Sequence, residues 1–95
     1  MPKFVIERDI PGAGAMSREE LHGASTLSCA VLDDLGPDIQ WVHSYVTQDK
    51  LYCVYIAQSE QLIRDHAERS GFPANRVSEV RAMIDPTMAY AAAAA

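Results

Sequence analysis

The chain has 95 residues, of which 48% are hydrophobic and 22% are charged, and its formal net charge is -5. This length predicts a single domain. The acidic balance argues against a nucleic-acid partner, because phosphate contacts need clustered Lys and Arg. No stretch approaches the roughly 20 apolar residues of a membrane span. Charges at residues 7–9 interrupt the apolar run that a signal peptide needs, so we expect a cytoplasmic protein without membrane association.

The first half of the chain predicts a strand followed by a helix. Residues 3–10 begin apolar and end charged, and a loop rich in Pro and Gly follows them. Ser17 and Glu20 have the spacing of a capping box, which predicts a helix start. Gly36 and Pro37 end that helix, because glycine favours a C-cap and proline cannot continue a helix.

The second half predicts a hairpin, a helix and a last strand. Residues 39–47 and 51–57 are rich in aromatic and β-branched residues and are joined by a short polar link. A helix begins at Ser59 and ends near Gly71, and residues 76–84 form the last strand. The resulting order is that of an α+β, ferredoxin-like βαββαβ fold, with an antiparallel sheet and two helices on one face. We expect one domain over residues 1–87 and a disordered or artificial tail over residues 88–95.

Both faces of the predicted sheet carry apolar side chains. The second strand alternates Ile39, Trp41, His43 and Tyr45 with Val42, Ser44 and Val46, and the third strand is similarly mixed. Monomers seldom expose such a face. We therefore expect a homodimer, packed sheet against sheet or closed through edge strands into a barrel-like pair. A bound apolar ligand is the alternative cover.

A dimer of this kind leaves a cleft for a small-molecule ligand. The residues that we expect to line it are Trp41, Tyr45, Tyr55 and Cys53, together with His43. In an enzyme or ligand-binding protein, His43 would be a general base and Tyr45 a hydrogen-bond donor. No H-x-x-x-H, C-x-x-C or H-E-x-x-H spacing occurs in the chain. We therefore assign no catalytic residue and no organic cofactor site.

The three histidines are the candidate metal ligands. His43 lies in the middle of a strand, and it is either a metal ligand or base, or a half-buried residue bonded to a neighbour. His66 points inward from the second helix, as a ligand or as a residue at the edge of the core. His22 shares a helix side with Cys29, but the two are too far apart in sequence for one tetrahedral site without a partner segment. Imidazole donors suit nickel or zinc.

Charges on the first strand predict an ion pair inside the fold. Glu7, Arg8 and Asp9 alternate across a strand that is central in the ferredoxin-like order, so at least one charge faces a covered side. Arg81 is a candidate counter-ion for Glu7. The two cysteines, Cys29 and Cys53, are expected to be free thiols rather than a disulfide.

The chain also resembles a known family. The run WVHSYVTQDKLYCVYIA and the later run IRDHAERSGFPANRV resemble a small bacterial family of unknown function with nickel-binding members, over Phe4 to about Asp85. The resemblance implies a ferredoxin-like homodimer that binds nickel for sequestration or detoxification. His66 and Cys53 match positions of the family pattern. Arg8-Asp9 and Phe72 stand where nickel-binding members carry histidines, so the chain resembles a sister branch.

The leading hypothesis is therefore a non-enzymatic, nickel-binding homodimer with His43, His66 and His22 as imidazole donors. The alternative hypothesis is a dimeric enzyme or small-molecule-binding protein that uses the cleft around Trp41, His43 and Tyr45. A third hypothesis is a structural dimer module in which the histidines serve only in packing.

Overall fold

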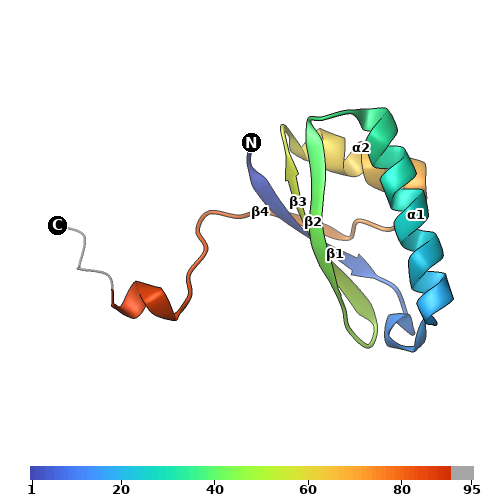
Figure 1. Ribbon diagram of the computed structural model, residues 1–95, viewed down its shortest axis with the longest axis horizontal. Helices are drawn as coiled ribbons and strands as arrows, with labels where there is room; N and C mark the ends of the chain where they lie inside the picture. Colours follow the sequence, from blue (N-terminus) through green and yellow to red (C-terminus); the bar gives the residue numbers. More distant parts are fainter. Residues whose placement is uncertain (91–95) are drawn as a thin grey trace.

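The computed structural model describes residues 1–90 and confirms the α+β, ferredoxin-like order of elements. Four strands form one antiparallel sheet in the order β2-β3-β1-β4, so the first strand is central as expected. Both helices lie on one side of the sheet (Figure 1). The main elements are β1 (Lys3–Asp9), α1 (Arg18–Leu35), β2 (Ile39–Val46), β3 (Lys50–Ala57), α2 (Glu60–Ser70) and β4 (Arg76–Glu79).

Both helices begin and end at the residues that the sequence indicates. Ser17 accepts a hydrogen bond from the Glu20 amide at 3.1 Å, and the Glu20 carboxylate accepts one from the Ser17 amide at 3.0 Å. This reciprocal pair satisfies two amide groups that the first turn of α1 leaves without helical partners. The helix ends at Gly36, and α2 ends at Gly71, whose φ of 77° is the left-handed conformation that glycine adopts without strain.

The last strand is shorter than the predicted span of residues 76–84. β4 pairs with β1 only as far as Glu79, and the Val80 amide makes one more bond to the Lys3 carbonyl. β1 starts at Lys3, so the sheet has no further partner for residues beyond 80. The chain then leaves the domain, with a short 3₁₀ helix, η2, at Pro86–Ala89 (Figure 1).

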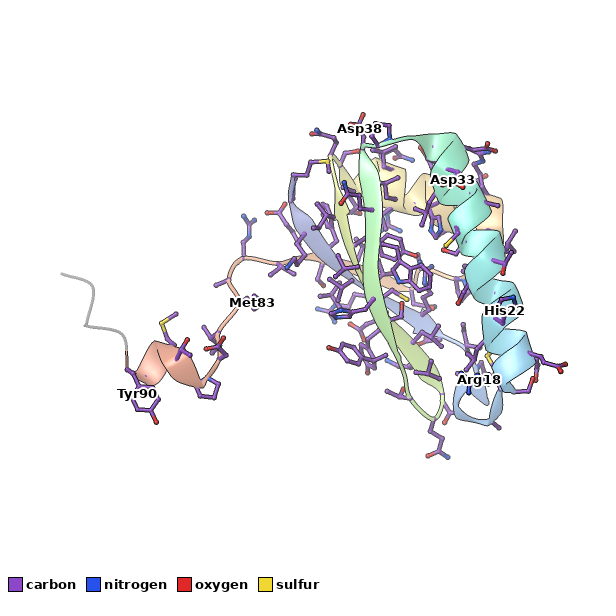
Figure 2. The ribbon with its side chains drawn as sticks, in the orientation of Figure 1. Arg18, His22, Asp33, Asp38, Met83 and Tyr90 are labelled. Atoms are coloured by element: carbon purple, nitrogen blue, oxygen red, sulfur yellow. The ribbon has the colours of Figure 1, made fainter. Side chains whose placement is uncertain are left out.

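The segment beyond Val80 is exposed throughout its described length, residues 81–90. Figure 2 shows Met83 and Tyr90 on this segment, away from the domain, and they are 77% and 87% exposed. The predicted tail of residues 88–95 begins within η2, and residues 91–95 lie outside the described residues. Among residues 1–90, no helix is both long and apolar enough to cross a membrane.

The core lies between the sheet and the two helices. Its buried members come from three strands and α2, and they are Phe4, Ile6, Ile39, Cys53, Tyr55, Ala57 and Ile63. Alternate residues of β1 and β3 point to this side, which leaves the intervening residues on the opposite surface of the sheet. We call that opposite surface the open face. No described element covers the open face, so it is the surface available to the sheet-against-sheet form of the predicted dimer.

Candidate functional site

A bulge in β2 separates the residues of the predicted cleft. Trp41 pairs with Tyr55, but the next pair is His43 with Val54, so Val42 is an extra residue in β2. One extra residue reverses the alternation of the strand, because successive side chains point to opposite faces. Trp41 consequently lies on the helix side, while His43 and Tyr45 lie on the open face. Within one chain, Trp41 is therefore on the opposite side of the sheet from His43 and Tyr45, the residues with which the predicted cleft groups it.

The other two cleft residues stay with Trp41. Cys53 and Tyr55 are 4% and 2% exposed and point toward the helices. Tyr45 is 59% exposed, and its ring lies edge-on to the His43 ring with the centroids 5.0 Å apart. The predicted ligand residues thus divide into a buried group on the helix side and an exposed aromatic pair on the open face.

The three histidines lie in three different environments. His66 on α2 is completely buried, His43 is exposed on the open face, and His22 is exposed on α1 (Figure 2). Within residues 1–90, no three His, Cys, Asp or Glu side chains are grouped so that they could hold a metal ion. The predicted set of His43, His66 and His22 is therefore not brought together by one chain.

A buried arginine occupies the helix side of the sheet. Arg8 is 1% exposed, although it carries the largest of the fully buried side chains. Its Nη1 donates to the Pro73 carbonyl at 2.8 Å and its Nε donates to the Cys53 Sγ at 3.4 Å. The guanidinium also lies 5.9 Å from the centroid of the Tyr55 ring and 5.7 Å from that of Phe72.

The expected ion pair forms on the open face and leaves Arg8 without a carboxylate. Glu7 contacts Lys50 at 3.4 Å and Arg76 at 3.9 Å, whereas the proposed counter-ion Arg81 contacts Glu79. No described carboxylate lies within 4.0 Å of the Arg8 nitrogens, and its Nη2 is buried with no hydrogen-bond partner. Burying a charge without a partner costs free energy of folding, so the position of Arg8 is unusual and calls for an explanation.

Burial and the neighbouring Arg8 charge together set the protonation of His66. The His66 Nε2 lies 3.0 Å from the Ser28 Oγ, its Nδ1 has no partner, and its ring packs against Tyr55 with centroids 5.2 Å apart. Burial, and then the Arg8 charge, lower the pKa of His66 from 6.5 to about 4. Burial also raises the pKa of the Tyr55 hydroxyl above its usual value. This environment favours neutral groups and disfavours a further cation.

A cavity of about 220 Å³ adjoins the arginine, between α1 and the sheet. Its wall is mostly apolar, with contributions from Leu21 and Ala24 of α1 and from Trp41 and Leu51 of the sheet. Arg8 supplies the charge of the wall, and Ser28 links the wall to His66. This combination of apolar walls and a few polar groups is typical of small-molecule sites.

Comparison with known proteins identifies the family. A family model described as "Nickel responsive protein SCO4226-like" matches residues 4–80. The chain belongs to the SCO4226-like family. The crystal structure of SCO4226 from Streptomyces coelicolor A3(2) has a similar fold, with a TM-score of 0.73 and 20% identity over 86% of this chain and 99% of that one. At that identity the likeness shows the fold alone, and no curated protein matches the chain.

One chain does not by itself fit the metal that the family description names. The buried candidate ligands His66 and Cys53 both lie beside the Arg8 charge, which opposes a divalent cation there. The exposed imidazole of His43 has no such neighbour among the contacts of the described residues, and its ring contact is with Tyr45. Within residues 1–90, the side chains therefore form no ready-made metal site in a single chain.

The sequence did not mark Arg8 as a binding residue. The sequence indicated that at least one of the charges at residues 7–9 is buried. It did not indicate which one, or that the buried charge lacks a counter-ion. The alternation of β1 could have identified Arg8 as the inward residue, because Phe4 and Ile6 precede it at the same spacing.

Proposed function

We propose that this protein is a homodimer that binds nickel through the open face and acts by sequestration rather than catalysis. The observation that carries the proposal is membership in a nickel-responsive family, combined with an exposed histidine on the uncovered side of the sheet. The apolar and aromatic residues of the open face are Val5, Tyr45, Tyr52, Val54 and Ile56.

A second copy of this chain is the partner that suits the open face. In a two-fold dimer the same patch meets itself, so every residue near the axis is present twice. Two copies of His43 would then supply two imidazoles, which are ligands that nickel accepts readily. Further side chains of the pair or water fill the remaining positions. Burial of the Tyr45 and Val54 side chains would supply the hydrophobic free energy of association.

Isothermal titration of metal-free, untagged protein with nickel chloride tests the proposal, and sedimentation velocity tests the dimer. We expect wild-type protein to sediment as a dimer and to bind nickel. His43→Ala should lose nickel binding. His22→Ala is the matched control, since it removes an exposed imidazole from α1, and it should bind nickel as wild type does.

Four results would contradict the proposal. Absence of binding heat in wild type would exclude the nickel function. Binding that survives in His43→Ala and disappears in His22→Ala would move the site to α1. Binding that disappears only in His66→Ala would place the metal beside Arg8, against the electrostatic argument. A wild-type monomer would remove the second set of ligands.

A further inference from the structure

The cavity beside Arg8 is separate from the open face and has a chemistry of its own. It lies on the helix side of the sheet, and Val46, which contributes to its wall, is 43% exposed, so the cavity reaches the surface. His43 and Tyr45 do not line it. Any ligand of this cavity is therefore distinct from the metal proposed for the open face.

We propose that this cavity is a binding site for a small organic carboxylate with an apolar body, whose carboxylate pairs with Arg8. The proposal depends on an unpaired buried charge next to an apolar cavity of suitable size, and it does not depend on the nickel function.

The hydrogen bonds of Arg8 leave the donors that a carboxylate needs. A guanidinium has five N–H groups, and the contacts to Pro73 and Cys53 use one on Nη1 and one on Nε. Both N–H groups of Nη2 and one of Nη1 remain. Two neighbouring nitrogens with free N–H groups match the two oxygens of a carboxylate in a fork-to-fork pair.

The charge of the site selects an anion over a neutral ligand or a metal. Arg8 is 1% exposed and no described carboxylate neutralises it, so a ligand carboxylate would remove the cost of an isolated buried charge. The polar groups near Arg8 add no negative charge, because Ser28 is neutral and burial raises the pKa of the Tyr55 hydroxyl, which keeps it protonated. His66 stays neutral near pH 7 because its pKa is lowered to about 4.

The walls of the cavity select an apolar body. Leu21, Leu51 and Phe72 are apolar, and the Trp41 indole N–H is already bonded to the Ser44 Oγ at 2.9 Å. The wall around Trp41 therefore offers a ring face rather than a free donor. An apolar cavity of about 150 Å³ holds one benzene molecule, so about 220 Å³ accommodates one ring or a short branched chain together with a carboxylate.

The test uses benzoate as the probe and benzyl alcohol as its neutral counterpart of similar shape. Both are titrated into full-length wild-type protein, with isothermal calorimetry for affinity and two-dimensional amide NMR for location. We expect benzoate to bind about tenfold more tightly than benzyl alcohol or better, since hydrogen bonds between charged partners are the strong ones. The shifted amides should lie on the N-terminal half of α1 and on β3.

Two variants separate the charge from the cavity. Arg8→Met keeps an apolar side chain of similar length and removes every N–H donor, so it should bind both probes with equal affinity. Ala24→Phe fills the cavity from α1 and should abolish binding of both probes. Its matched control is Ala30→Phe on the same helix, because Ala30 is exposed and does not line the cavity, and it should bind as wild type does.

Each unfavourable outcome overturns the proposal. Benzoate that gives neither heat nor shifts in wild type excludes the site. Equal affinity for the two probes in wild type shows an apolar cavity without anion recognition. A preference for benzoate that persists in Arg8→Met assigns the recognition to another residue, and benzoate binding that survives in Ala24→Phe places it elsewhere on the protein.

Discussion

Acidification should destabilise this protein through His66. The pKa of this histidine falls from 6.5 in the unfolded chain to about 4 in the folded one, because burial and Arg8 oppose its charged form. Above pH 6.5 the residue is neutral in both states and has no effect. As the pH drops below 6.5 the unfolded chain takes up a proton that the folded protein refuses, so the free energy of unfolding falls until about pH 4.

The size of this effect is large for a domain of this length. One pKa unit corresponds to about 1.4 kcal/mol, so the shift predicts a loss of about 3 kcal/mol between pH 6.5 and pH 4. Domains of this kind are stable by about 5–15 kcal/mol in total. The loss at His66 alone would then be a sizeable share of the total stability.

Urea unfolding, followed by Trp41 fluorescence at several pH values, measures the effect. His66→Gln cannot take up the proton, so its stability should fall less steeply than that of wild type. The difference between the two pH dependences isolates His66 from the carboxylates that titrate in the same range. His22→Gln, at an exposed position on α1, is the control and should follow wild type. Parallel curves for wild type and His66→Gln would refute the reasoning.

Three further predictions concern stability at neutral pH, each measured by urea unfolding. Arg8→Met should leave the free energy of unfolding within about 1 kcal/mol of wild type or raise it, because replacing an unpaired buried charge by an apolar side chain is often stabilising. A loss above about 3 kcal/mol would show that the contacts of the Arg8 side chain outweigh the cost of burying its charge. Ser17→Ala should cost about 1 kcal/mol through the lost capping box, with Ser78→Ala, exposed on β4, as the near-neutral comparison. Ile63→Ala, at a position with no exposure, should cost about 2–5 kcal/mol through the cavity that it creates, and a cost below 1 kcal/mol would contradict its place in the core.

Local signals in the sequence predicted the fold because each one acts within a few residues. The Ser17–Glu20 pair, the terminal glycines of both helices and the short link between residues 47 and 51 depend on their own neighbours alone. Once the order of elements is known, few topologies remain, and the ferredoxin-like arrangement is one of them. The fold could therefore be predicted without knowledge of any long-range contact.

The candidate site was predicted less well because it depends on the register of β2 and on the absence of a counter-ion for Arg8. The bulge at Val42 decides which side Trp41 and His43 occupy, and the regular alternation around it gives no sign of an extra residue. The unpaired state of Arg8 depends on where every nearby carboxylate points, which no spacing in the sequence reveals. The predicted span of the last strand, residues 76–84, was also too long. The length of a strand is limited by the strand it pairs with, and β1 offers no partner beyond Lys3.

The two proposals lie on opposite sides of one sheet, and β3 takes part in both. Cys53 faces the helices and accepts a hydrogen bond from Arg8, while the next residue, Val54, faces the other way and pairs with His43. Neighbouring residues of a strand point to opposite faces, so a substitution on one side leaves the donors of the other side in place. Arg8→Met should therefore remove benzoate recognition without changing nickel binding, and His43→Ala should do the reverse. If one variant removes both activities, the two sites are coupled through the sheet, and a model of two independent sites is wrong.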